Sequence, residues 1–180
     1  MIFQVNTSID VTALGLYDSS GTTLQISHDV GIYNQTTQTL VASTTVPAGS
    51  CGTLVDGFCF GVLGSPVLLN PGDYVSVLTM PADNGDLQFG LATSITTAGE
   101  ITYLNSAFDV GANLHFPNPA NNGDFAKGFA GPNFLFQAAV PEPAGVFLLG
   151  AVVAILLAAV PRREWLGALG LTRSGRSARP

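Results

Sequence analysis

Eight short segments that alternate apolar and polar residues, or are apolar throughout, most strongly limit the folds open to this chain. Turn signals rich in Gly, Pro, Asn, Asp and Ser separate them. Residues 70–73, Asn-Pro-Gly-Asp, place Pro and Gly as a type II turn requires. The segments are residues 9–17, 29–33, 39–46, 57–63, 74–79, 87–92, 101–104 and 134–137.

No part of residues 1–139 shows the pattern of a helix of ten or more residues. Short strands at this spacing predict an all-β fold, an antiparallel β-sandwich that is jelly-roll-like. This length suits one domain with a real core. We therefore expect a single β-sandwich domain over residues 1–139, with no helix longer than about two turns.

Residues 144–160 are seventeen consecutive uncharged residues, mostly Ala, Val, Leu, Ile and Phe. As a helix they would span ~26 Å, close to the ~30 Å thickness of a bilayer's hydrocarbon core. The run has no polar face, which disfavours the alternative of a buried helix in a globular domain. Pro143 suits the first turn of a helix. The run predicts a single C-terminal transmembrane helix.

The charges orient this helix. Ten acidic residues and one lysine precede residue 141, leaving a net charge of −9, whereas five arginines and one glutamate follow residue 161. Positive charge stays on the cytoplasmic side of a membrane span. We therefore expect residues 162–180 inside and residues 1–140 outside. The acidic body is a poor partner for nucleic acid.

The order of Val140-Pro141-Glu142-Pro143, one apolar run and Arg162-Arg163-Glu164 resembles the PEP-CTERM sorting signal of bacterial exported proteins. The resemblance covers residues 140–164. It implies that an exosortase, a membrane-embedded cysteine-type sorting protease, reads Pro141, Glu142, Pro143, Arg162 and Arg163. It also implies cleavage near the triplet and passage from the inner membrane to the cell surface or extracellular matrix. Residues 165–180 extend beyond such signals as a basic tail, which we expect to be disordered.

The body resembles a recurrent ectodomain of PEP-CTERM proteins in the stretches VTALGLYDSSG, HDVGIYNQTTQTLVASTTVPAG, LVDGF, LNPGDYVSV and GPNFLFQ. This resemblance implies a β-sandwich and points to no particular activity. Such domains begin with a further strand, of which residues 3–5 resemble a remnant. The start lacks the basic and apolar regions of a signal peptide, so we expect a truncated N-terminus and one incomplete sheet edge prone to association. The alternative is a cytosolic protein with a tail anchor.

Cys51 and Cys59 are the only cysteines, and an exported location permits a disulfide between them. The alternative is two free thiols in neighbouring strands. His28 and His115 are the only histidines, and both are interpreted as structural or surface residues. No ligand spacing predicts a transition-metal site or a cofactor. Calcium candidates are Asp83, Asn84 and Asp86 in one turn, and a similar cluster at residues 121–124, although ordinary solvated turns are favoured.

Three functions follow from these features. The favoured one is a non-catalytic surface or matrix protein associated with extracellular polysaccharide or biofilm. The alternative is a carbohydrate- or ligand-binding module, which two or three exposed aromatics in a row on one sheet would favour. An enzyme is the third, which paired carboxylates in a pocket or a histidine paired with an acid would favour. A buried acid–histidine group at His28 or His115 would overturn both the sandwich prediction and the non-catalytic interpretation.

Overall fold

The computed structural model describes residues 1–18, 23–80, 86, 95–106, 113–118 and 131–139, which are all-β with antiparallel strands and no helix. Met1–Ala139 form one compact unit, and Val140–Pro180 form a second. The sorting signal, the expected span at residues 144–160 and the tail all lie outside the described residues. In the described part of the chain, no helix has the length and apolar character needed to cross a membrane.

The strands form two main sheets and one small pair. The five-stranded sheet has the order β10 (Ile101–Asn105), β1 (Ile2–Val5), β9 (Gly72–Leu78), β4 (His28–Asn34) and β5 (Leu40–Val46). The four-stranded sheet has the order β11 (Pro132–Ala138), β2 (Ile9–Tyr17), β8 (Phe58–Leu69) and β7 (Thr53–Val55). The two-residue strands β3 (Thr23–Leu24) and β6 (Gly49–Ser50) pair separately.

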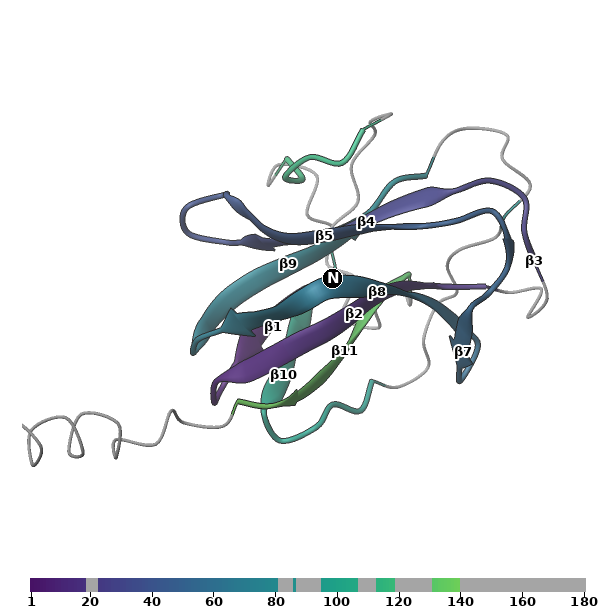
Figure 1. Cartoon of the computed structure of the whole chain (residues 1–180). Helices are drawn as coiled ribbons and strands as arrows, with labels where there is room; N and C mark the ends of the chain where they lie inside the picture. The colour runs from purple at the N-terminus through teal and green to yellow at the C-terminus, as the bar shows by residue number, and fades with distance from the viewer. Residues whose placement is uncertain (19–22, 81–85, 87–94, 107–112, 119–130, 140–180) are drawn as a thin grey trace, which may run out of the picture. The chain divides into compact units, whose positions relative to one another are not determined.

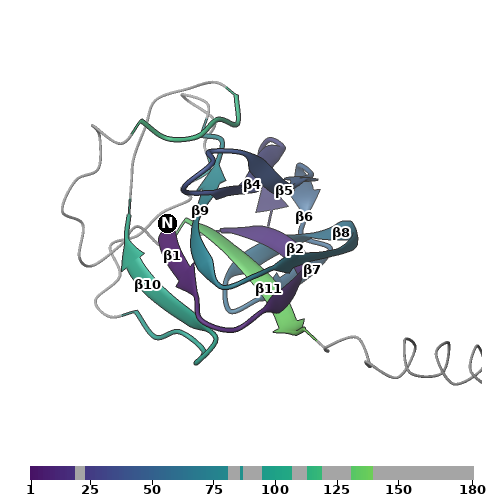
Figure 2. The same ribbon diagram turned by 90° about the vertical axis from the view of Figure 1, so that its left-hand side faces the viewer.

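The two main sheets pack face to face, as the stacked layers in Figure 1 show. β5 packs against β8, β4 and β5 against β2, and β9 against β11. Figure 2 shows β10 and β1 at one end of the larger sheet and β4 and β5 at the other. The arrangement is sandwich-like, as the alternating segments predicted.

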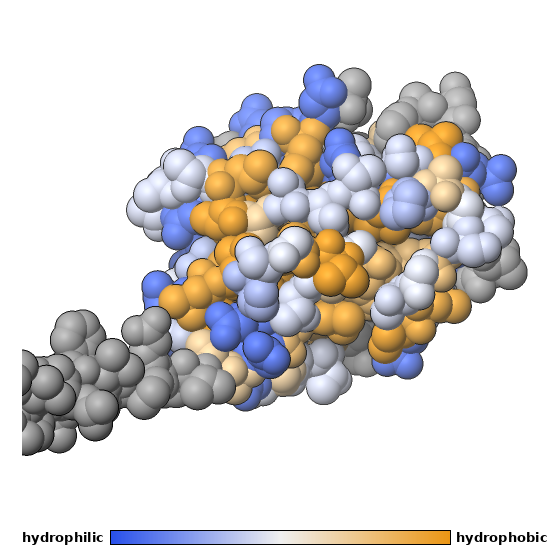
Figure 3. All heavy atoms as spheres, in the orientation of Figure 1, coloured by the Kyte–Doolittle hydropathy of each residue, from blue (hydrophilic) through white to orange (hydrophobic). Residues whose placement is uncertain are grey.

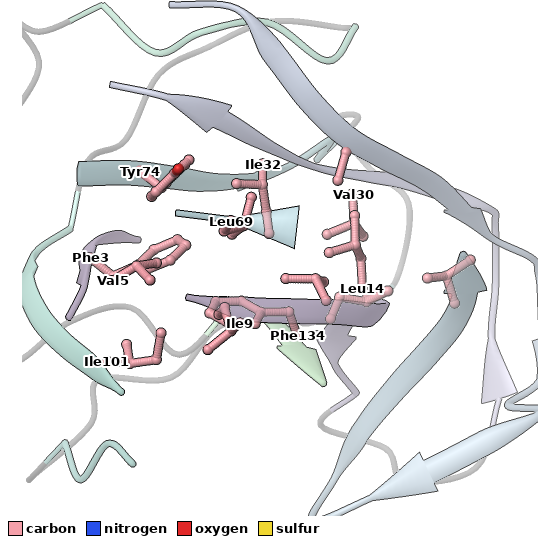
Figure 4. Close-up of a cluster of buried hydrophobic side chains, with 14 of the residues drawn as sticks. Phe3, Val5, Ile9, Leu14, Val30, Ile32, Leu69, Tyr74, Ile101 and Phe134 are labelled. Atoms are coloured by element: carbon pink, nitrogen blue, oxygen red, sulfur yellow. The ribbon is translucent and has the colours of Figure 1, made fainter. Parts of the chain in front are cut away.

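Alternation places one face of most strands of the two main sheets in a shared apolar core (Figure 4). The ring of Phe3 from β1 lies 5.9 Å from that of Tyr74 in β9 and 4.8 Å from that of Phe134 in β11. Phe3 therefore joins the two sheets. Burying a side chain of this size contributes roughly 1.5–3 kcal/mol. The Tyr74 hydroxyl donates to the Asn70 carbonyl at 3.0 Å, which fixes the entry into β9.

Most predicted strands agree with the structure, and residues 9–17 match β2 at both ends. Residues 87–92 lie outside the described residues. β8 runs to Leu69, well past the predicted end at residue 63, and its register with β2 shifts between Val11 and Ala13. β7 was not predicted. It forms a hairpin with β8 through Asp56 and Gly57, whose φ angles of 50° and 82° are those of a type I′ turn.

The first strand is internal, so the expectation that the start of the chain leaves a sheet edge incomplete is wrong. β1 lies between β10 and β9 and pairs with both. The amino group of Met1 donates to the carbonyl of Ser76 at 2.7 Å, and the Ser76 N–H donates back to the Met1 carbonyl at 2.8 Å. Burial lowers the pKa of this amino group from 8.0 to about 5.

Candidate functional site

A buried histidine–aspartate pair is the most polar feature of the core. His28 is the first residue of β4, and its side chain is completely buried. Its Nε2 lies 3.0 Å from Oδ2 of Asp86, a residue between β9 and β10. Its Nδ1 lies 3.0 Å from the carbonyl oxygen of Thr79, one residue past the end of β9. The ring therefore joins the start of β4 to two other parts of the chain.

The Asp86 carboxylate is held by backbone donors as well as by the ring. The N–H of Gln25 donates to Oδ1 at 2.9 Å and to Oδ2 at 3.0 Å, and the N–H of Ile26 donates to Oδ2 at 3.2 Å. Burial alone would raise the pKa of Asp86, but the Gln25 N–H, the His28 ring and the Ile26 N–H together lower it below its usual value. The carboxylate is therefore ionised at neutral pH.

A second set of hydrogen bonds surrounds the pair. The N–H of Asp29 donates to Oγ1 of Thr79 at 2.9 Å, and the N–H of Thr79 donates to the Asp29 carbonyl at 2.9 Å. The Asp29 carboxylate accepts from the Thr45 hydroxyl at 2.6 Å. These bonds continue the pairing of β4 with β9 and β5, so the backbone around His28 is fixed on both sides.

The pair meets the criterion stated above for an enzyme, and the sequence did not predict it because 58 residues separate its members. Its geometry is that of a structural clamp. A general base needs a ring nitrogen within reach of a substrate proton. In this structure, protein acceptors engage both nitrogens of a fully buried ring. Catalysis at His28 would first require breaking one of these contacts.

Cys51 and Cys59 form a disulfide, with their Cα atoms 5.3 Å apart. Cys59 lies in β8 opposite Leu54 of β7, so the bridge reinforces the β7–β8 hairpin. Oδ2 of buried Asp18 lies 3.9 Å from the sulfur of Cys51 and 3.8 Å from that of Cys59. These three residues would offer metal ligands only as thiolates and carboxylate, and the disulfide removes both thiolates.

Of the other predicted site residues, the structure describes only His115 and Asp86. His115 is exposed, and its Nδ1 lies 2.7 Å from the Asn113 carbonyl. Asp86 was a calcium candidate, but its carboxylate is hydrogen-bonded by the Gln25 and Ile26 N–H groups and the His28 ring. Asp83, Asn84 and residues 121–124 lie outside the described residues, as do the five residues of the sorting signal.

Three aromatic rings adjoin on the outer face of the four-stranded sheet; we call Tyr17, Phe58 and Phe60 the aromatic row. The neighbours Leu16 and Cys59 point into the core, so alternation directs these rings outward. Tyr17 and Phe58 are half-buried with centroids 5.5 Å apart and planes inclined by 66°. Phe60 is only 6% exposed and lies 6.2 Å from Phe58. The rings do not form one flat, open platform.

Apolar groups on the face seen in Figure 3 are scattered among polar ones. Val62 of β8 has the highest exposure of the large hydrophobic side chains in the described residues, at 70%. Scattered exposed apolar residues of this kind are normal for a protein surface.

In comparisons with protein-family models, curated proteins and solved structures, nothing matches this chain.

Proposed function

We propose that this chain is a non-catalytic exported protein of the bacterial cell surface or extracellular matrix, delivered through a PEP-CTERM-type sorting signal. The observation that carries the proposal is the order of Pro141-Glu142-Pro143, the uncharged run 144–160 and Arg162-Arg163. The run is long enough to span a bilayer as a helix. The arginines at its end favour a cytoplasmic location for residues 162–180.

The disulfide supports an exported location. Disulfides form and persist in oxidising compartments and are rare in the cytosol. Cys51 and Cys59 are the only cysteines of the chain, and they are paired with each other. The body also forms a compact unit that ends at Ala139, directly before the triplet region. Cleavage near the triplet would therefore release an intact β domain.

In this proposal the run 144–160 anchors the chain in the inner membrane until an exosortase cuts near the triplet. The body then reaches the cell surface, where extracellular polysaccharide is its expected partner. It needs no cofactor for this role. Its net charge of −9 over residues 1–140 opposes binding to nucleic acid and favours solubility outside the cell.

The test is intact-mass analysis of the protein recovered from the surface of a bacterial host that has an exosortase. The mature chain should end near Pro143 and lack the run 144–160. Glu142→Ala should leave the full-length chain in the membrane fraction, whereas Glu164→Ala, the matched change beyond the arginines, should have a smaller effect. A surface form that retains Arg162 would contradict the proposal.

The second candidate is a carbohydrate-binding module, for which the two half-buried rings of the aromatic row offer a small apolar surface. Tyr17 and Phe58 are partly exposed on the face of one sheet, and aromatic faces are apolar surfaces suited to sugar rings. A polysaccharide pull-down with residues 1–139 tests this function. Retention that is lost in Tyr17→Ala and kept in Tyr103→Ala would establish it. Equal retention of both variants would remove the aromatic row from consideration.

A further inference from the structure

Two successive backbone N–H groups and one buried ring nitrogen converge on the Asp86 carboxylate. The N–H groups belong to Gln25 and Ile26, between β3 and β4, and the ring nitrogen is Nε2 of His28. All three lie within 3.2 Å of Oδ2. Successive N–H groups that point into one concavity are a recurrent way of binding anions, and a charged donor strengthens such bonds.

The acceptors around His28 determine its protonation. A backbone carbonyl can only accept, and an ionised carboxylate can only accept. The carbonyl of Thr79 faces Nδ1, and the carboxylate of Asp86 faces Nε2. A neutral ring carries one N–H and would leave one buried acceptor facing a lone pair, which is costly. Only the imidazolium form donates to both acceptors, and this is the form that the proposed site uses.

The surroundings leave Asp86 as the anion paired with this charge. Asp29 follows His28 in the strand, so its side chain points to the opposite face, where it accepts from Thr45. The residue of β5 paired with His28 is the apolar Val46, and Thr79, one residue past β9, contributes its carbonyl. The Asp86 carboxylate faces the ring directly, with Oδ2 at 3.0 Å from Nε2.

We propose that the Gln25 and Ile26 N–H groups and the His28 imidazolium form a carboxylate-binding site, which Asp86 fills from within the chain. A small external carboxylate such as formate fills the site when the Asp86 side chain is removed. The site recognises a planar anion with two acceptor oxygens, because both oxygens of Asp86 accept there. It fastens the chain at residue 86 to the β3–β4 connection, and this role is independent of surface sorting.

The direct test is chemical rescue of Asp86→Ala in the full chain, kept in detergent and followed by thermal unfolding. The variant should melt at a lower temperature than the wild type. Formate should raise that temperature in a saturable way, whereas formamide, the neutral analogue, should not. The response should be absent from the wild type and from the Asp86→Ala, His28→Gln double variant. An equal response in wild type and variant, or none in the variant, would overturn the proposal.

Asp73→Ala is the matched control, since Asp73 is a half-buried aspartate outside the site whose carboxylate accepts from Gln4. It should show no saturable response to formate. A saturable response in this control would assign the effect to a general action of the anion.

A second measurement decides the proposal if Asp86→Ala does not fold. The chain has only two histidines, so labelling with ¹⁵N-histidine gives two ring systems in an NMR spectrum. At neutral pH both nitrogens of His28 should have the shifts of protonated nitrogen. Exposed His115 serves as the internal reference. A single protonated nitrogen on His28 would contradict the binding site as described.

Discussion

The ring of Phe60 in β8 lies directly against the backbone of Gly15 in β2. A Cβ atom built on Gly15 would come within 2.5 Å of Cδ1 of Phe60 and within 2.6 Å of the carbonyl oxygen of Cys59. The two residues are opposite each other in the β2–β8 register. Because Gly15 has no side chain, the ring of Phe60 can lie against its backbone and become buried.

Gly15→Ala should destabilise the fold by about 1–3 kcal/mol, because both the ring and the strand backbone must move to admit a methyl group. Gly64→Ala is the matched control. Gly64 lies in β8, the strand that contains Phe60, and a Cβ there meets nothing within 4 Å. Urea unfolding measures the free energy of unfolding for each variant. Equal effects from the two changes would contradict this account of the Phe60 contact.

Loss of the disulfide should lower stability by about 2–3 kcal/mol, because the bridge limits the freedom of the unfolded chain over a loop of this size. The loop closes across a sequence separation of 8. A Cys51→Ser, Cys59→Ser variant should unfold at a lower urea concentration than the oxidised protein. Adding a reductant should shift the wild type toward the variant and leave the variant unchanged. A reductant-insensitive wild type would disprove the contribution.

The buried amino group of Met1 should make stability rise between about pH 5 and pH 8 in the chain that begins there. Burial lowers its pKa to about 5, so the folded chain has lost a proton that the unfolded chain keeps up to its ordinary pKa of 8.0. Stability increases with pH wherever the unfolded state binds more protons. The expected gain is about 1–4 kcal/mol.

Urea unfolding across this pH range provides the measurement. A chain with residues added before Met1 replaces the ammonium group with an amide, which can still donate to Ser76. The added rise in stability should disappear in that chain. The two chains share all side chains from Met1 onward, so the difference between their profiles isolates the amino group. Identical pH profiles would show that the amino group is not buried in solution.

Reporter fusions test the orientation proposed for residues 144–160. A periplasm-active reporter joined after residue 140 should be active, and the same reporter after residue 180 should be inactive. Replacing Arg162 and Arg163 with glutamine should weaken this preference, since positively charged residues keep their end of a membrane span in the cytoplasm. Equal periplasmic activity at both positions would rule out a single span with this orientation.

Local pattern made much of the fold predictable. β2 alternates over nine residues and ends in a polar turn, so both its ends could be located. The predicted end of β8 at residue 63 is too early, and the next residues include Gly64 and Pro66, which are typical strand breakers. β7 pairs with β8 only as far as Phe60, so Pro66 interrupts no hydrogen bond on that side. β7 has only three residues and was missed, although the sequence does contain the Asp-Gly turn signal that follows it.

The site could not be predicted in the same way. The sequence indicates that His28 lies at the start of a strand, but its partners Thr79 and Asp86 come from distant parts of the chain. No spacing rule links them, because sheet topology alone brings the end of β9 beside the start of β4. The order of strands within each sheet likewise depends on long-range pairing that alternation does not encode.

The internal position of β1 has a consequence for when this domain can fold. Phe3 pairs with Tyr103, and Ile9 pairs with Ala138, so each sheet needs residues from nearly opposite ends of the body. Pairings this distant make folding slow, because large loops must close before the contacts that stabilise them form. Neither sheet can be completed while the ribosome still holds its closing strand. A growing chain therefore cannot complete either sheet until almost the whole body has been synthesised.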